Sequence, residues 1–475
     1  MIIIQLTGGL GNQMFQYAFA KSLAHDLNTN FLIDTEFYNT STFKIKFINF
    51  LLKIGTPLYK IACRLSLRIN STIPYPPNLK YMQREGHEFY NLGCFNIDSS
   101  CLNKEYLNEI RSTALKNQYN EGLPLLHPQK IDLKEIKMPS YFKGVYQFEE
   151  YFIHNEDLIR NDFEFITPLI GKNKEIADDI KEHNSIAIHI RRGDFFKAPT
   201  HSLVTMNYYE KSIEYIAKNV ENPKFFIFSN DPEWVKENIK IPHDTYYVTN
   251  NSSEKGYEDM RLMSLCDHFI IANSTFSWWG AWLSKNKDKI VIKPEPGLIS
   301  RIAPISQIKS KKCVSIENDY KDHFNDSDII LAHIDYSNIK NSISKIKNIK
   351  MDTNNNQIKL TSTKNNSSLF KNSKLFLKDI QRLNPENWSV LKLSFNCESN
   401  DSLQFFYLTK DSNIYNILQR FPIHYEENDD LEIYIPISPE ILLNGLILVP
   451  FEKVNSTINI KSIEIREIKK PKEFN

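Results

Sequence analysis

The sequence predicts an α/β protein that carries an additional all-β module at its carboxyl-terminal end. Residues 2–34 contain a short apolar run, a glycine-rich turn, a helical pattern and a second apolar run. This order is typical of the start of a parallel sheet. Strand and helix patterns alternate regularly over 186–293, which predicts a doubly wound parallel sheet. Short alternating runs over 376–468 predict an antiparallel β-sandwich.

The first unit contains a glycine cluster between its first strand and first helix. Gly8, Gly9 and Gly11 stand there, in a chain with only 14 glycines among 475 residues. A tight turn needs one or two glycines, so the cluster and Asn12 favour a loop that a ligand approaches closely. The helix amino terminus that follows favours an anion. The expected elements are a strand at 2–6, a helix at 13–27 and a strand at 30–34.

The same loop resembles a dinucleotide-binding turn only in part. A complete fingerprint needs a glycine three residues after Gly11, and Met14 occupies that position. Asp34 stands where an acid that binds a ribose could lie. An NAD-dependent Rossmann oxidoreductase is therefore one alternative function.

Residues 37–84 differ from the rest of the first unit, because they contain eight basic residues and no acidic one. They form either a helical insertion that packs on the core, or a basic amphipathic surface. Such a surface would rest peripherally on an anionic inner membrane leaflet, or lie near a lipid-linked or acidic acceptor. The aromatic-rich segment 142–152 is expected to end the first unit.

The second unit has the most regular pattern in the chain. Its elements alternate about five times, and ligands of such sheets bind at the carboxyl ends of the strands. The expected strands lie at 186–190, 225–229, 245–249, 268–272 and 290–293, and the expected helices at 207–219, 232–239, 257–266 and 276–285.

One candidate binding motif, HIRRGDF, follows the strand at 186–190. Arginine offers a charged planar fork that matches phosphate. Arg191 and Arg192 point to opposite sides if the strand pleat continues, so one should face the ligand. The other is expected to pair with Asp194 or to hold the domain together.

A second candidate motif, ANSTFSWWGAW, connects the strand at 268–272 to a helix. Its hydroxyl residues could cap the helix or bind a diphosphate at the helix amino terminus. The spacing of its three tryptophans is typical of a buried helix face. Asp259, near the start of the preceding helix, either complements the helix dipole or accepts hydrogen bonds from a purine.

The charge balance, the cysteine spacing and the composition limit the classes of protein to which the chain can belong. Lys plus Arg (58) balances Asp plus Glu (57), so no global field would attract nucleic acid. The six cysteines show no metal-binding spacing, and we expect a cytoplasmic protein without a signal peptide or membrane span. Residues 337–375, rich in Asn, Lys and Ser, are interpreted as a linker or exposed loops.

Four segments together resemble a known family: GGLGNQMFQYAFA, HIRRGDF, SNDPEWVKENI and DMRLMSLCDHFIIANSTFSWWGAWL. They resemble the bacterial family 11 glycosyltransferases, the α-1,2-fucosyltransferases, over about residues 1–300. The resemblance implies transfer of L-fucose from GDP-β-L-fucose to a hydroxyl, usually of a galactoside, with inversion and without a metal. The implied acceptor is a surface polysaccharide or oligosaccharide. The sequence departs from the family at Asn230, where an acidic residue often stands.

The implied fold is GT-B-like, a pair of Rossmann-type domains with the active site between them. The expected divisions are an acceptor-side domain at 1–165, a GDP-sugar-binding domain at 166–300, a connecting segment at 301–375 and the sandwich module at 376–475. The aromatic side chains of the module are either core or a sugar platform, so a non-enzymatic glycan-binding protein is a further alternative. They are Phe405, Phe406, Tyr407, Tyr415, Phe421 and Tyr425.

The resemblance also implies roles for individual residues. Arg191 matches the arginine expected to neutralise the β-phosphate of the leaving GDP. The base that accepts the proton of the acceptor hydroxyl is Asp194, His201 or neither: an arginine partner would lower the pKa of Asp194, whereas histidine has a suitable pKa. Donor-binding roles are implied for Gly9, Gly11, Asn12, His189, Arg191, Asp259, Ser274, Thr275 and Ser277.

Overall fold

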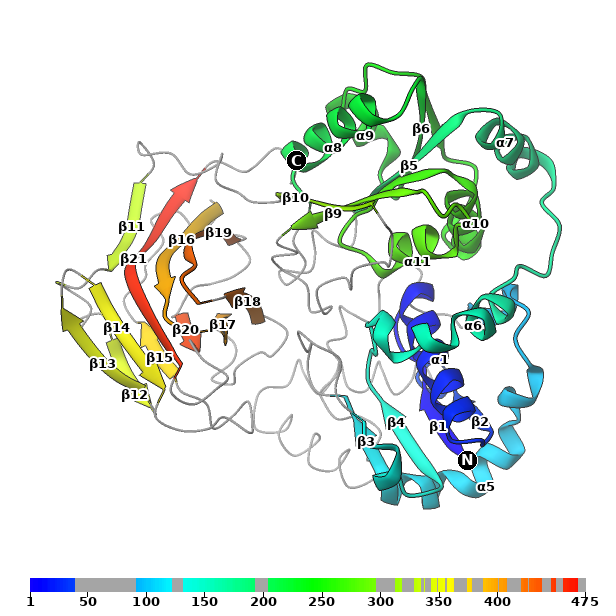
Figure 1. Cartoon of the computed structure of the whole chain (residues 1–475), viewed down its shortest axis with the longest axis horizontal. Helices are drawn as coiled ribbons and strands as arrows, with labels where there is room; N and C mark the ends of the chain where they lie inside the picture. The colour runs from blue at the N-terminus through cyan, green and yellow to red at the C-terminus, as the bar shows by residue number, and fades with distance from the viewer. Residues whose placement is uncertain are drawn as a thin grey trace, which may run out of the picture.

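The computed structural model describes residues 1–38, 91–121, 131–192 and 204–295, and a series of strands with short turns between 312 and 468 (Figure 1). All but the first two residues of the basic segment 37–84 lie outside the described residues. Asp194 and His201 lie outside them as well, so the two candidate bases stay predictions.

The first sheet is parallel throughout and has the strand order β2-β1-β4-β3. Ile2 and Ile4 pack into the cluster of buried side chains that includes α1, whereas Ile3 packs with Leu107 of α5. Alternate side chains of β1 therefore face helices on both sides of the sheet. The elements are β1 (Ile2–Gln5), α1 (Leu10–Asp26), β2 (Phe31–Asp34), α5 (Lys104–Ala114), β3 (Gln118–Asn120) and β4 (Ser140–Lys143).

The predicted strands and helix of residues 2–34 are confirmed. For the segment 142–152, the sequence predicted the end of the first unit but no strand. Phe142 and Lys143 belong to β4, which pairs with both β1 and β3. This strand is short and bounded by Pro139 and Gly144, so the sequence shows no extended apolar run there.

The second sheet is also parallel, with the order β10-β9-β8-β5-β6-β7. Ile186 and Ile188 pack in the cluster that contains α8 and α9, and Ala187 packs in the cluster that contains α10 and α11. Helices thus cover both faces, as predicted. The strands are β5 (Asn184–Ile190), β6 (Pro223–Ser229), β7 (Thr245–Val248), β8 (His268–Ile270), β9 (Ile290–Glu295) and β10 (Lys312–Glu317). The helices from residue 156 onward are α6 (Glu156–Asp162), α7 (Gly171–Lys181), α8 (Met206–Asn219), α9 (Pro232–Asn238), α10 (Gly256–Leu265) and α11 (Thr275–Leu283).

Helices α1 and α11 join the two parallel sheets (Figure 1). The Phe15 ring of α1 lies 4.6 Å from the ring of Trp278 and 4.9 Å from that of Trp279, measured between centroids. The indole N–H of Trp279 donates to the backbone oxygen of Gly11 at 3.0 Å. Trp278, Trp279 and Trp282 are fully buried, as their spacing predicted. One continuous apolar cluster therefore runs through both sheets.

The strands from β11 onward form two further sheets, in which all pairings are antiparallel. One has the order β13-β14-β21-β16-β19, with β11 also on β21, and the other the order β12-β15-β20-β17-β18. The strands are β11 (Ile329–Ile334), β12 (Ile343–Lys347), β13 (Ile349–Asn354), β14 (Gln357–Ser362), β15 (Lys374–Leu377), β16 (Trp388–Cys397), β17 (Asp401–Tyr407), β18 (Arg420–Tyr425), β19 (Asp430–Ile437), β20 (Leu446–Val449) and β21 (Thr457–Ile468).

The interpretation of residues 337–375 as a linker is wrong where β12, β13, β14 and β15 lie. In β14, Ile358 and Leu360 are buried while Lys359 and Thr361 lie on the opposite face. The polar composition concealed this alternation, which is the pattern of a strand with one solvated face.

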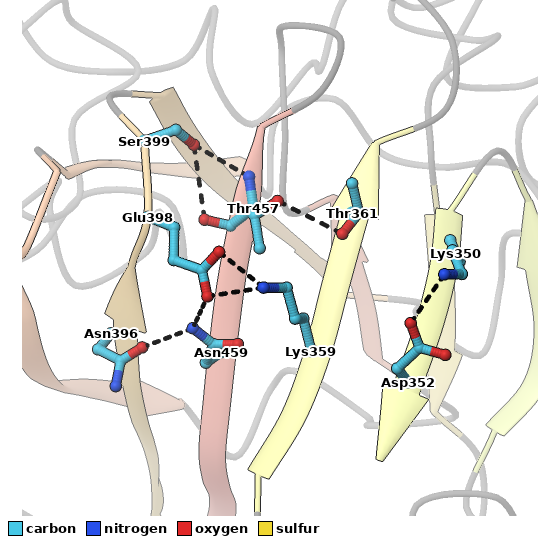
Figure 2. A network of polar contacts seen from close by, with 9 residues as sticks. All are labelled: Lys350, Asp352, Lys359, Thr361, Asn396, Glu398, Ser399, Thr457 and Asn459. Atoms are coloured by element: carbon cyan, nitrogen blue, oxygen red, sulfur yellow. Dashed lines mark hydrogen bonds and ion pairs between the residues drawn. The ribbon is translucent and has the colours of Figure 1, made fainter. Parts of the chain in front are cut away.

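A polar network crosses the solvated face of this sheet (Figure 2). The Glu398 carboxylate accepts two hydrogen bonds from Lys359 Nζ, at 2.7 and 2.9 Å, and one from the Asn459 amide at 2.8 Å. Asn459 also donates to Asn396 Oδ1 at 2.8 Å. The network joins β14 and β21 to β16 and the residue that follows it, and so fixes the register of neighbouring strands. The side chains of Phe405, Phe406, Tyr407, Tyr415, Phe421 and Tyr425 lie outside the described part of the chain.

Candidate functional site

The glycine loop at residues 8–12 and the Ser/Thr turn at residues 273–277 meet where the carboxyl ends of β1 and β8 lead into α1 and α11. Asn12 of the glycine loop and Thr275 of the Ser/Thr turn are 263 positions apart, yet Thr275 Oγ1 donates to Asn12 Oδ1 at 3.1 Å. In parallel sheets this edge is where ligands bind. The fold therefore brings together two segments that the sequence indicated as separate candidate ligand-binding loops.

Two glycines of the loop are required by close approach. Gly8 has a φ of +78°, and a Cβ built there would lie 2.5 Å from Asn12 Nδ2. A Cβ on Gly11 would lie 2.6 Å from Thr275 Oγ1. Gly11 is thus needed for the contact between α1 and α11, while Gly9 caps α1 with extended backbone.

His189 stands at the carboxyl end of β5 and is 4% exposed. Its ring lies 5.5 Å from that of Phe276 in α11, and its Nδ1 has no hydrogen-bond partner among the described residues. Burial, reinforced by the charge of Arg191, lowers the pKa of His189 to about 3. The imidazole is therefore neutral in the physiological range and offers hydrogen bonds without charge.

The two neighbouring arginines have different surroundings. Arg192 is 3% exposed, its Nε lies 3.1 Å from Asp231 Oδ2, and its guanidinium lies 3.3 Å from the ring centroid of Trp234. Its backbone N–H donates to Asn230 Oδ1 at 2.8 Å. Arg192 therefore holds the turn between β6 and α9, and its described carboxylate partner is Asp231. Arg191 is half-buried.

The hydroxyl residues before and within α11 have separate roles. Ser274 caps the helix, because its Oγ accepts from the backbone N–H of Phe276 at 3.3 Å. Ser277 is fully buried and its hydroxyl donates to backbone oxygens of Ser274 and Ala272, at 3.2 and 3.4 Å. Its hydroxyl is thus engaged with backbone oxygens at the start of α11, whereas the hydroxyl of Thr275 reaches Asn12 of the glycine loop.

Asp259 lies in the first turn of α10, as the sequence predicted. Its Oδ1 accepts from the Asn251 amide at 2.7 Å, and Asn251 in turn accepts from Asn173 of α7 at 2.9 Å. Burial raises the pKa of Asp259 to about 6, against the opposing effect of the hydrogen bond from Asn251. The start of α10 is close to α11, since a Cβ on Gly256 would lie 4.0 Å from Phe276.

Two buried amides at the same edge were not singled out from the sequence. Gln147 follows β4, and its Nε2 donates to Asn12 Oδ1 at 2.8 Å. Asn273 precedes the cap residue Ser274, and its Oδ1 has no partner among the described residues. Each is 2% exposed. The sequence offered no signal for Gln147 beyond its aromatic surroundings.

Asp34 does not serve the alternative function that depended on it. It is 1% exposed, accepts from the Tyr141 hydroxyl at 2.5 Å and lies 2.9 Å from Arg111 Nε. A carboxylate that is buried and paired in this way is not available to a ribose. The oxidoreductase hypothesis therefore loses its ribose-binding acid.

The described residues show neither a metal-binding cluster nor a membrane-spanning helix. They contain no group of three or more His, Cys, Asp or Glu side chains that could hold a metal ion. No helix within the same ranges has the length and apolar character that crossing a membrane requires.

Comparisons with known proteins agree with the resemblance in the motifs. A model of glycosyl transferase family 11 matches residues 1–297. An α-1,2-colitosyltransferase of Escherichia coli is 32% identical over 313 residues, which are 62% of this chain and 92% of the relative. The O-antigen biosynthesis glycosyltransferase WbnK of Escherichia coli is 32% identical over 318 residues, 61% of this chain and 92% of the relative.

More distant similarities cover smaller parts. Galactoside α-(1,2)-fucosyltransferase 1 of Mus musculus is 26% identical over 110 residues, 22% of this chain and 29% of the relative. Among solved structures, a family 29 carbohydrate binding module from Piromyces equi aligns with 28% of this chain and 80% of its own length. Its TM-score of 0.21 and identity of 13% are too low to assign a fold.

Proposed function

The chain belongs to glycosyl transferase family 11, and we propose that it transfers L-fucose from GDP-β-L-fucose to a galactoside with inversion. The proposed acceptor atom is O-2 of a terminal galactose in a surface polysaccharide or oligosaccharide. The observation that carries the proposal is the meeting of the glycine loop with the Ser/Thr turn. That meeting lies within the matched range 1–297. Family membership makes the chain a glycosyltransferase and so replaces the oxidoreductase and glycan-binding alternatives.

The donor-side chemistry follows from the charge of the leaving group. Departure of GDP leaves negative charge on the β-phosphate, and Arg191 at the end of β5 supplies a fixed guanidinium for it. Such preorganised donors contribute roughly 3–4 kcal/mol each to transition-state stabilisation. Ser274, Thr275 and N–H groups at the start of α11 add uncharged donors. We propose that these groups replace a metal ion.

We assign recognition of the guanine base to one acidic and one neutral side chain. Asp259 accepts hydrogen bonds from the N–H groups of guanine, and His189 shapes the same pocket as a neutral imidazole. Asp194 or His201 receives the proton of the acceptor hydroxyl, or an oxocarbenium-like transition state makes a base unnecessary.

The proposed arrangement is GT-B-like, with domains at 1–165 and 166–300 and a β-sandwich module at 376–475. Peripheral contact of 37–84 with the inner leaflet, in the cytoplasm, remains part of the proposal.

The experiment combines a donor choice with a pair of matched variants. The purified chain is incubated with a galactoside and either GDP-fucose or GDP-colitose, because colitose is fucose without the 3-hydroxyl. GDP release and product mass are measured. We expect transfer from GDP-fucose, and preference for GDP-colitose would overturn the donor assignment. Absence of both transfer and GDP binding would overturn the function.

The variants separate the two arginines. Arg191→Lys should lower kcat by about 100-fold or more with little change in Tm, because a point charge does not reproduce the planar fork. Arg192→Lys should instead lower Tm, since it loses the stacking on Trp234. Equal losses of activity in both variants at equal Tm would contradict the assignment of Arg191.

A further inference from the structure

The buried side-chain amide of Gln147 has a hydrogen-bond partner for its nitrogen but, among the described residues, none for its oxygen. Its Nε2 donates to Asn12 Oδ1 at 2.8 Å, but its Oε1 has no hydrogen-bond partner among the described residues. The residue is only 2% exposed. A buried carbonyl oxygen without a partner costs about 1–3 kcal/mol, so such atoms in native proteins usually have a role. The missing partner must be a hydrogen-bond donor.

Gln147 and Thr275 together fix the orientation of Asn12. Both donate to Asn12 Oδ1, at 2.8 and 3.1 Å, from opposite halves of the transferase part. A carboxamide whose oxygen accepts two such bonds has its N–H₂ on the other edge. That edge lies over Gly8, because a Cβ built on Gly8 would be 2.5 Å from Asn12 Nδ2. Asn12 therefore presents a donor to the space above the glycine loop.

The backbone that delivers Gln147 is itself held in an unusual conformation. Tyr146 has a φ of +49°, which costs free energy for a non-glycine residue. The Glu121 carboxylate accepts from the N–H groups of Val145 and Tyr146, at 2.8 and 2.5 Å. A Cβ on Gly144 would lie 2.4 Å from Glu121 Cβ. This turn at the end of β4 is fixed by several contacts, as is typical of strained backbone at functional sites.

We propose that Gln147 is a positioning residue of the transferase site, and that its Oε1 accepts a hydrogen bond from a sugar hydroxyl. Its Nε2 sets the Asn12 carboxamide so that Asn12 Nδ2 donates to the diphosphate of the nucleotide sugar. An amide oxygen cannot bind phosphate, because both groups only accept. The hydroxyl belongs to the transferred sugar or to the acceptor sugar, and kinetics distinguish the two. The inference rests on the proposed function.

The experiment uses the full chain with Gln147→Met, Gln147→Glu, Asn12→Ala and the double variant Asn12→Ala/Gln147→Met. Affinity for GDP, kcat, KM for donor and for acceptor, and Tm are measured. Gln147→Met, which removes both hydrogen bonds, should lower kcat at least 10-fold and raise one of the two KM values. The raised KM identifies the sugar that carries the hydroxyl. GDP affinity should also fall, but by no more than in Asn12→Ala, because the Asn12 donor to the diphosphate loses its orientation.

Two comparisons exclude a merely structural role. Gln147→Glu keeps an acceptor oxygen and should restore KM, but not kcat, because a carboxylate repels Asn12 Oδ1. The double variant should have the kcat of Asn12→Ala alone, since coupled residues are not additive. The matched control Gln118→Met makes the same chemical change in β3 and should resemble the wild type.

The results that overturn the proposal are distinct from those that overturn the function. Wild-type kinetics in Gln147→Met, additive losses in the double variant, or a GDP affinity of Gln147→Met below that of Asn12→Ala would each overturn the role of Gln147 alone. If Gln147→Met does not fold, the KM and kcat values of Gln147→Glu decide. A wild-type chain that transfers no sugar overturns both proposals.

Discussion

Folding and the guanine binding that we propose for Asp259 have opposite requirements. Burial raises the pKa of its carboxyl to about 6, above the ordinary value of 3.8. The ionised form therefore costs stability in the folded protein. A guanine base, by contrast, needs that ionised form as an acceptor for its N–H groups. Such a conflict is common at binding sites, where stability is lost in favour of function.

The substitution Asp259→Asn should raise stability while it weakens GDP binding. Above pH 6 the folded wild type carries the unfavourable charge, and this cost disappears as the pH falls from 6 to 4 and the folded state takes up a proton first. The variant should therefore be more stable than the wild type by about 1–3 kcal/mol at pH 7.5, with a smaller gain at pH 4.5. Thermal unfolding at both pH values and calorimetry with GDP provide the measurements. A less stable variant at pH 7.5, or unchanged GDP affinity, would contradict it.

Residue chemistry was predictable from the sequence only where the motif itself specifies it. The cap at Ser274 and the burial of the tryptophans followed from residue type and spacing. The structural role of Arg192 did not, because it depends on Trp234, which lies in another helix. Gln147 could not be found at all, since its importance comes from Asn12.

At the scale of elements, the contact between α1 and α11 determines the spacing of the two motifs. Glycine at position 11 permits it, because any side chain there would meet the first turn of α11. Helices α10 and α11 were predicted within two residues at each end, since strong periodicity marks them, whereas α1 begins three residues before its predicted start. Strands β4 and β10 were missed, because each is short and its apolar character is interrupted.

Gly11→Ala should destabilise the protein, although alanine is the better helix former. The new Cβ would lie 2.6 Å from Thr275 Oγ1 and 2.7 Å from the Thr275 carbonyl carbon, so the helices must separate. We expect a loss of about 1–3 kcal/mol in unfolding free energy and a fall in transferase activity. The control Gly256→Ala meets only Phe276 at 4.0 Å and should be neutral or up to about 1 kcal/mol stabilising. Urea unfolding of both variants checks the contrast, and equal effects would refute it.

At the scale of the whole molecule, the family match and the parallel sheet end at different places. The match stops at residue 297, whereas β10 at Lys312–Glu317 pairs along its full length with β9. Val314 and Ile316 also pack against the cluster beneath α8. The sheet therefore includes a strand from the segment that was expected only to connect two modules.

A truncation series follows from this difference. A chain of residues 1–317 should fold and transfer sugar to a small soluble galactoside with kcat within about threefold of the full chain. A chain of residues 1–297 should have a lower Tm, because removing an edge strand exposes apolar side chains of β9 and α8. Thermal unfolding and the transfer assay test both chains. Equal stability of the two truncated chains would show that β10 contributes nothing to the sheet.

The sequence by itself determined the class of fold, the order of the transferase elements and the family, because local periodicity and contiguous motifs carry that information. It also predicted antiparallel strands at the carboxyl-terminal end. Only the tertiary structure decided which arginine is structural, why Gly11 is required, and how Gln147, Asn12 and Thr275 form one hydrogen-bonded unit. These properties depend on contacts between residues that lie far apart in the chain, from 39 positions for Arg192 and Asp231 to 263 positions for Asn12 and Thr275. A local sequence pattern does not specify which distant residue will be in contact. For Asn12, Thr275 and Gly11, the packing of α1 against α11 decides those contacts.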